Sequence, residues 1–457
     1  MTRVAAHIND AAITLLREDG IAYREPGFAL LDDRNLITGS EAFAGARVHP
    51  RSVQHRYWTN LTTTPLPVQR FSHLSAADLV SRQLEQMWAA GGESAAELVV
   101  AVPAYMDTKH LGLFLGIAGE LNLPVVAMVD AAVAATRREY CDAVPVHIDM
   151  SLHATTLTRL AQPGHVQVER VEVLQDCGIH ALYDLWLNTL AEAFVQQSRF
   201  DPLHTAETEQ MLLNELPAWL AQAAHRDRIE LRMGYGGIDH EAEVESLALI
   251  GAAAPIYQPI ASKLRALYRA GETPAIQVTD RVARLPGLPE MLKARVGGEL
   301  FVLEPGATAR GALARLRQAP GPAGGVSLRR HLPWDQSAAK VESDDTAQVH
   351  AGVPTHLLFG SKAYAIAASP PLALGTQTAD GERTIALGSD MPGISRRHCS
   401  VALRDGQCVL EDHSRYGTFL NGHRIDGSTV LQVGDSLRVG SPGYEFHLIT
   451  TDEAYGT

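Results

Sequence analysis

The hydrophobic pattern of the chain changes at about residue 320. Before that point, apolar runs typical of buried strands alternate with longer segments that have one apolar helical face, which predicts a layered α/β domain. After residue 352, short alternating runs are separated by Gly, Pro and Asp turns, as in an all-β sandwich. The sequence therefore predicts two domains of different fold class, at 1–319 and 353–457.

The segment 320–352 separates these two patterns. It contains a Pro/Gly-rich stretch and the acidic run Glu342-Ser343-Asp344-Asp345-Thr346. Such a composition buries too little apolar surface to offset the chain entropy that is lost on folding. We therefore expect residues 320–352 to form a flexible linker.

Composition limits the classes of function. The chain has 457 residues and a formal net charge of −13, which argues against binding to nucleic acid, because phosphate backbones require a concentrated basic face. No apolar run is long enough for a membrane span, and the first residues lack the apolar core of a secretory signal. The four cysteines have no Cys-x-x-Cys spacing, so we expect reduced thiols and no metal site. These features favour a cytoplasmic protein.

The first domain should contain a mostly parallel sheet. Its predicted elements are strands at 98–103, 124–129 and 146–149, with helices at 108–121 and 130–140. Strands that alternate with helices in this order are typical of crossover connections between parallel strands.

Two polar segments stand out in the second domain. They are Ser395-Arg396-Arg397-His398 and, further on, the run from Ser414 to Gly422. A dianionic phosphate is bound by guanidinium groups, a hydroxyl and backbone N–H groups that a rigid scaffold presents together. The spacing of the two segments resembles that of a forkhead-associated (FHA) domain, and the resemblance covers about 353–450.

The FHA resemblance implies a β-sandwich that recognises a threonine-phosphorylated partner protein. It assigns contacts with the phosphopeptide to Ser395, Arg396, Arg415, Tyr416, Thr376 and Arg383. It assigns structural roles to His398, Gly417, Asn421 and Gly422, with His398 bracing the loop from inside.

Two positions depart from the FHA pattern. The family's Gly-Arg pair aligns with Gly375-Thr376, so the arginine that grips the phosphate is replaced, and Arg383 or Arg415 is a candidate substitute. Tyr416 stands where the family has an asparagine that contacts the peptide. Two interpretations stay open: phosphothreonine binding, and docking that needs no phosphate.

The first domain resembles the actin and DnaK-type heat-shock chaperone superfamily. The resemblance rests on ordered matches at 100–107, 116–122, 130–135, 276–288 and 304–312. It implies an actin-like fold, a duplicated ribonuclease H-like unit that holds ATP between two glycine-rich hairpins.

The nucleotide site implied by that resemblance is degenerate. The two phosphate loops would fall at 7–11 and 149–154, where side chains replace the glycines that let the backbone approach phosphates. The remaining site residues would be Asp149, Asp130 in place of a water-orienting glutamate, and Thr279 and Asp280 on the adenosine side. We therefore expect a pseudo-ATPase with no catalytic residues, no metal and no required cofactor, in which any bound ATP/Mg is not hydrolysed.

The leading functional hypothesis is a cytoplasmic adaptor or scaffold. Its FHA domain would recruit a phosphothreonine-containing protein, while the ATPase-like domain docks on a partner or assembles as a homo-oligomer. The alternatives are a divergent chaperone-like ATPase, and an actin-like filament subunit whose FHA domain docks without phosphate.

Overall fold

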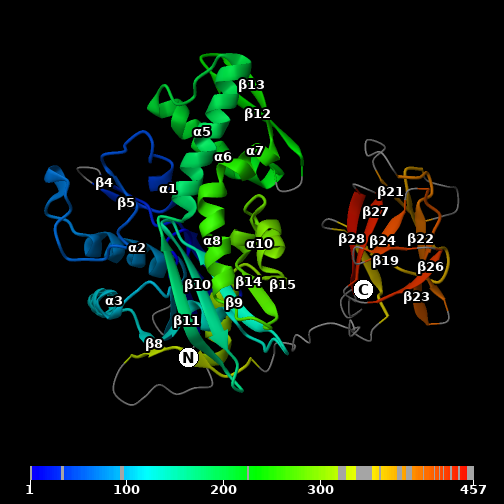
Figure 1. The fold of residues 1–457 in the computed structure, drawn as a ribbon, viewed down its shortest axis with the longest axis horizontal. Helices are drawn as coiled ribbons and strands as arrows, with labels where there is room; N and C mark the ends of the chain where they lie inside the picture. Colours follow the sequence, from blue (N-terminus) through cyan, green and yellow to red (C-terminus); the bar gives the residue numbers. More distant parts are fainter. Residues whose placement is uncertain are drawn as a thin grey trace. The chain divides into compact units, whose positions relative to one another are not determined.

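The computed structural model describes most of the chain in two compact units, Met1–Ser343 and Asp344–Thr457 (Figure 1). The described residues are 3–31, 35–92, 97–223, 226–316, 326–335, 353–359, 362–377, 383–387, 394–404, 406–415, 417–420, 423–425, 427–432, 435–440 and 443–449. None of the helices among these residues is long and apolar enough to cross a membrane.

The first sheet of the first unit is built around β1 (Arg3–His7). β1 pairs antiparallel with β2 (Ile13–Arg17), which pairs antiparallel with β3 (Gly20–Glu25). On its other side β1 pairs parallel with β7 (Glu97–Val102), and β7 pairs parallel with β8 (Val125–Asp130). The strand order is therefore β8-β7-β1-β2-β3, with the short β16 (Leu328–Arg329) at the β8 edge.

The second sheet repeats this arrangement. β9 (Val144–Met150) pairs antiparallel with β10 (Ala154–Ala161), which pairs antiparallel with β11 (Val166–Gln175). On the other side of β9 lie two parallel strands, β14 (Pro274–Val278) and β15 (Glu299–Val302). In both sheets a three-stranded meander is followed by two parallel strands on the side of its first strand.

The remaining elements of the first unit surround these sheets, with α5, α6 and the β12–β13 hairpin together at one end (Figure 1). The helices are α1 (Ser40–Phe43), α2 (Ala76–Gly91), α3 (Thr108–Glu120), α4 (Ala131–Ala135), α5 (Ile179–Ser198), α6 (Ala206–Ala223), α7 (Ser246–Ala252), α8 (Ala254–Ala266), α9 (Asp280–Ala283), α10 (Leu288–Val296) and α11 (Ala307–Leu316), with a 3-10 turn at Gln69–Phe71. The other strands are β4 (Ala29–Leu31), β5 (Leu36–Thr38), β6 (Val53–Gln54), β12 (Arg228–Tyr235) and β13 (Ile238–Glu245).

One predicted helix is shorter than expected. The pattern predicts a helix at 130–140, but α4 ends at Ala135. The reason is Arg315 of α11, whose buried guanidinium donates to the carbonyl oxygens of Val133, Ala134 and Thr136. Because these donors satisfy the last carbonyl groups of α4, the helix can end inside the protein without leaving them unpaired.

Part of the predicted linker belongs to the first unit. β16 (Leu328–Arg329) pairs with β8, and β17 (His331–Leu332) pairs with β11. Asp335 lies 2.8 Å from the guanidinium of Arg137. The prediction of a flexible linker is therefore wrong for residues 326–335, and the rest of 320–352 lies outside the described residues.

The second unit is an all-β sandwich of two sheets, as the sequence predicts. Its core combines Val401 and Leu410 of one sheet with Val439 and Phe446 of the other. The strands are β18 (His356–Phe359), β19 (Lys362–Ala365), β20 (Leu372–Gly375), β21 (Arg383–Ala386), β22 (Cys399–Arg404), β23 (Gln407–Asp412), β24 (Thr418–Leu420), β25 (His423–Arg424), β26 (Ser428–Leu431), β27 (Ser436–Gly440) and β28 (Gly443–Ile449).

Candidate functional site

His398 connects the two polar segments of the sandwich. The backbone N–H of Ser395 donates to Nδ1 of His398 at 3.1 Å, and Nε2 lies 3.1 Å from the carbonyl oxygen of Gly417. Because Nδ1 accepts a hydrogen bond, the imidazole is neutral and its Nε2–H donates to Gly417. Burial lowers the pKa of His398, which favours the same neutral form.

The hydroxyl of Ser395 joins the two segments a second time. Its Oγ accepts a hydrogen bond of 3.2 Å from the backbone N–H of Arg415, so its own proton is free to be donated to a ligand. Within the second segment, the hydroxyl of Ser414 accepts from the backbone N–H of Gly417 at 2.8 Å. The carboxylate of Asp412 accepts from the N–H of Ser414 and from the hydroxyl of Thr418. This loop cluster, made of 394–398 together with Ser414, Arg415 and Gly417, is therefore held in shape without a ligand.

Gly375-Thr376 lies directly beneath the first segment. A Cβ added to Gly375 would lie 2.1 Å from the carbonyl oxygen of Arg396, so only glycine allows the segment to pass this closely. The backbone N–H of Thr376 donates to the carbonyl oxygen of Ser395 at 3.2 Å. The structure thus brings Thr376 next to Ser395, but this position contributes no positive charge.

The structure does not bring Arg383 to the loop cluster. In the parallel pair β20–β21, Arg383 lies opposite Leu372, whereas Gly375 lies opposite Ala386. This register separates Arg383 from the Gly375 end of the strand by about 10 Å, at about 3.3 Å per residue. The guanidinium of Arg383 is also bound to the carbonyl oxygen of Ala365 at 2.8 Å. This register and this contact do not support the suggested role of Arg383 in phosphate binding.

Arg396 and Arg415 belong to the loop cluster, and Arg424 reaches it from the β24–β25 hairpin. Arg396 and Arg415 are exposed, and Arg424, which the sequence interpretation did not include, lies against Gly417. Within the part of the sandwich that the structure describes, none of these three guanidinium groups makes a hydrogen bond or an ion pair. Arg424 pairs with Phe419 in the β24–β25 hairpin, and this pairing brings the Arg424 side chain back to the loop cluster. Three predicted residues, Tyr416, Asn421 and Gly422, lie outside the described residues.

In the first unit, side chains connect the turns that lead out of the two central strands. Nδ2 of Asn9 donates to Oδ2 of Asp149 at 2.8 Å. Oδ1 of Asp10 accepts from the backbone N–H of Leu152 at 2.7 Å. Asp10 is fully buried, and this burial raises the pKa of its carboxyl group to about 6. Sequence reasoning recognised these turns but not the bonds between them, because the partners are about 140 residues apart.

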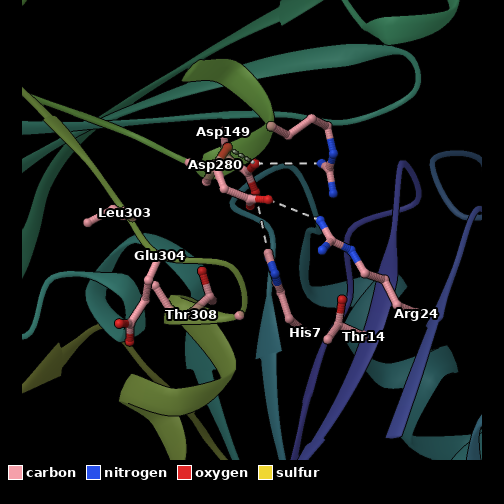
Figure 2. Close-up of a pocket in the computed structure, with 12 residues that line it drawn as sticks. His7, Thr14, Arg24, Asp149, Asp280, Leu303, Glu304 and Thr308 are labelled. Atoms are coloured by element: carbon pink, nitrogen blue, oxygen red, sulfur yellow. Dashed lines mark hydrogen bonds and ion pairs between the residues drawn. The ribbon is translucent and has the colours of Figure 1, made fainter. Parts of the chain in front are cut away.

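Asp149 is surrounded by partners from the protein itself (Figure 2). Besides Asn9, its carboxylate lies 3.3 Å from the hydroxyl of Thr279, 3.6 Å from Nε2 of His7 and 3.9 Å from Nη1 of Arg281. Burial acts to raise the pKa of Asp149, but the nearby His7 and Arg281 side chains and the Asn9 hydrogen bond together lower it. Burial lowers the pKa of His7 to about 4, so its imidazole is neutral at pH 7.

The pocket around Asp149 is small and crossed by an ion pair. The guanidinium of Arg24 on β3 reaches Asp280 at 3.2 Å and so connects the first sheet to the start of α9 (Figure 2). The cavity has a volume of about 30 Å³, enough for a water molecule or two. Ligand pockets for small molecules usually occupy roughly 300 Å³ or more. The pocket around Asp149 is therefore smaller than the usual pocket for a small molecule.

The structure brings together Asp149, Thr279 and Asp280, but not Asp130. Asp149, Thr279 and Asp280 all line the pocket. The carboxylate of Asp130 instead accepts from the backbone N–H groups of Ala132 and Val133, at 2.9 and 3.3 Å, as the N-cap of α4. Its predicted role in orienting water thus has no support in its geometry. Among the described residues, no cluster of His, Cys, Asp or Glu could hold a metal ion, and all four cysteines are free thiols.

Part of the chain matches a known protein family. Residues 380–440 match the family described as FHA domain. This range lies in the second unit and includes both loop segments and Arg424. A search of curated proteins found no match to the chain.

Proposed function

Because the second unit carries an FHA domain, which is a protein–protein interaction module, we propose that the chain is a cytoplasmic adaptor. Its loop cluster binds a threonine-phosphorylated partner, and its first unit is a docking or assembly module that does not hydrolyse ATP. The two units then act as linked binding modules, which gain affinity when both engage the same assembly.

One observation carries the phosphate-binding part of the proposal. The hydroxyl of Ser395 lies in a preformed loop cluster, with a proton to donate and unpaired guanidinium groups nearby. A phosphate group at pH 7 carries a charge of about −1.5 to −2 and three acceptor oxygens, which such groups complement. Little loop ordering is then needed on binding, because His398 already fixes the backbone.

Isothermal titration calorimetry tests this part directly. The full chain is titrated with a degenerate phosphothreonine peptide library and with the same library unphosphorylated. We expect micromolar binding that requires the phosphate and that is lost in the double variant Ser395→Ala/Arg396→Ala. Equal binding of both libraries would show instead that the loop cluster docks on its partner without phosphate.

The strand order supports the second part. Both sheets consist of a meander followed by two parallel strands, as expected for the duplicated ribonuclease H-like fold that the actin and heat-shock chaperone resemblance implies. In that family the backbone N–H groups of the two turns approach the phosphates of ATP. In this chain the Leu152 N–H is already bound by the carboxylate of Asp10, and Asp149 is paired with Asn9. An incoming phosphate would meet a buried negative charge, which disfavours its binding.

The second part is tested by adding Mg·ATP to the full chain and measuring heat of binding and phosphate release. We expect no saturable hydrolysis. Hydrolysis that saturates with ATP and disappears in Asp149→Ala would overturn the proposal and favour a divergent ATPase.

A further inference from the structure

The loop cluster lacks the guanidinium group that FHA domains direct at the phosphate from the position of Thr376. Thr376 is neutral. Arg383 lies at the other end of the β20–β21 pair from Gly375, and its guanidinium is bound to the carbonyl oxygen of Ala365. The loop cluster itself contributes the exposed guanidinium groups of Arg396 and Arg415, and a further guanidinium group comes from another strand.

Arg424 reaches the loop cluster from the β24–β25 hairpin. It pairs with Phe419, and the next residue, Ile425, donates its backbone N–H to the carbonyl oxygen of Thr418 at 2.8 Å. A Cβ added to Gly417 would lie 2.8 Å from Nε and 3.3 Å from Cζ of Arg424. The guanidinium of Arg424 therefore lies over Gly417, on the side where any other residue would place its side chain.

The side chain of His398 connects this same residue, Gly417, to Ser395. One imidazole ring and two hydrogen bonds span the distance from the Ser395 N–H to the Gly417 carbonyl oxygen. The guanidinium of Arg424 therefore lies against the residue that His398 joins to the Ser395 segment, and its long side chain can turn toward a ligand bound there.

The guanidinium of Arg424 is free to bind such a ligand. It is exposed and has no hydrogen-bond or ion-pair partner among the residues that the structure describes. Two other arginines of the sandwich, by contrast, are engaged: Arg404 pairs with Glu411 at 2.6 Å, and the guanidinium carbon of Arg438 lies 4.1 Å from the centre of the Phe419 ring. A guanidinium group that is to bind a phosphate must be exposed and unpaired before the phosphate arrives. Arg424 meets both conditions among the described residues.

We propose that Arg424 supplies the guanidinium that grips the phosphate, in place of the arginine missing at position 376. The inference rests on the proposed function, and it names the residue that makes phosphate recognition work in this chain. Ser395 donates its hydroxyl proton to one phosphate oxygen, while Arg424 binds two others through a pair of N–H groups.

The test compares Arg424→Gln with Arg404→Gln, a matched loss of an exposed sandwich arginine. The full-length variants are titrated with a degenerate phosphothreonine library that contains no Asp or Glu, so only the phosphate carries negative charge. Arg424→Gln should lose at least about tenfold in affinity, as expected for a hydrogen bond to a charged group, and Arg404→Gln should change it by less than about twofold. Unchanged thermal unfolding of Arg424→Gln would show that the loss is not due to misfolding.

A rescue variant tests whether Arg424 contributes its charge to phosphate binding or only holds Gly417 in place. Thr376→Arg should raise affinity in the wild-type chain and should restore phosphate-dependent binding to Arg424→Gln. Failure of this rescue would mean that Arg424 only braces Gly417, and would overturn the inference. A loss seen only with a library that contains Asp and Glu would assign Arg424 to peptide side chains and would also overturn it.

The proposed function and this inference fail in different ways. If the wild-type chain binds the phosphorylated library selectively and Arg424→Gln binds equally well, only the inference is wrong. If the wild-type chain shows no phosphate-dependent binding, both are wrong.

Discussion

The carboxylate of Asp10 accepts a hydrogen bond of 2.7 Å from the backbone N–H of Leu152. The two residues belong to the turns that follow β1 and β9, the central strands of the two sheets. The buried carboxylate of Asp10 in the turn after β1 therefore occupies a backbone N–H group in the turn after β9. The contact connects the two halves of the unit and fills a position where a bound anion would need a free N–H group.

Replacing Asp10 with Asn should change how stability depends on pH. The pKa of Asp10 is raised from 3.8 to about 6 in the folded protein, so its favourable contribution is complete below pH 3.8 and is lost as the pH rises through 6. Asn keeps an acceptor for Leu152 but does not titrate. The free energy of unfolding of Asp10→Asn, relative to wild type, should therefore increase with pH by up to about 3 kcal/mol.

Urea unfolding of Asp10→Asn between pH 5 and 7.5 checks this expectation. Asp19→Asn is the control, because Asp19 is an exposed carboxylate of the same unit. A difference between Asp10→Asn and wild type that stays constant over this range would contradict the prediction.

Arg315→Met should strongly destabilise the first unit. The side chain of Arg315 is 1% exposed and binds three carbonyl groups at the end of α4. Met fills similar space but leaves these acceptors buried without donors, at about 1–3 kcal/mol each. We expect a loss of at least about 3 kcal/mol in chemical unfolding. Arg310→Met, in the same helix but exposed, should change stability by less than about 0.5 kcal/mol.

His398 should be a neutral imidazole with its proton on Nε2. Burial lowers its pKa below the usual 6.5, so the stability it contributes is complete above pH 6.5 and is lost as the pH falls below that value. Long-range ¹H–¹⁵N NMR of the full chain, with His398→Ala to assign the signals, reports both the tautomer and the pKa. A charged ring at pH 7, or a proton on Nδ1, would be inconsistent with the hydrogen bonds to Ser395 and Gly417.

Gly375→Ala should displace the first segment of the loop cluster. The added methyl group would lie 2.1 Å from the carbonyl oxygen of Arg396, which is far inside van der Waals contact. We expect at least about a tenfold loss of affinity for phosphothreonine peptides in calorimetry, since the Ser395 hydroxyl would shift from its place. Gly112→Ala is the control, because its Cβ meets open space on α3. Unchanged affinity in Gly375→Ala would show that the position of this segment does not matter for binding.

Hydrophobic pattern was sufficient to predict individual elements but not their limits. The apolar runs at 98–103 and 124–129 become β7 and β8, because a buried parallel strand needs apolar side chains on both faces. The end of α4 was not predictable, since it depends on Arg315, about 180 residues away. Residues 326–335 have the composition of a linker, yet they form short strands at the edges of both sheets.

The sequence by itself determined the two fold classes, the sandwich loops that carry Ser395 and His398, and the loss of glycine from the turns after β1 and β9. These properties follow from residue type and local spacing. Only the tertiary structure decided that Arg383 binds Ala365, that Arg424 lies over Gly417 and that Asp10 binds Leu152. The reason is physical: strand register and hairpin pairing set which distant side chains meet, and no local pattern encodes those contacts.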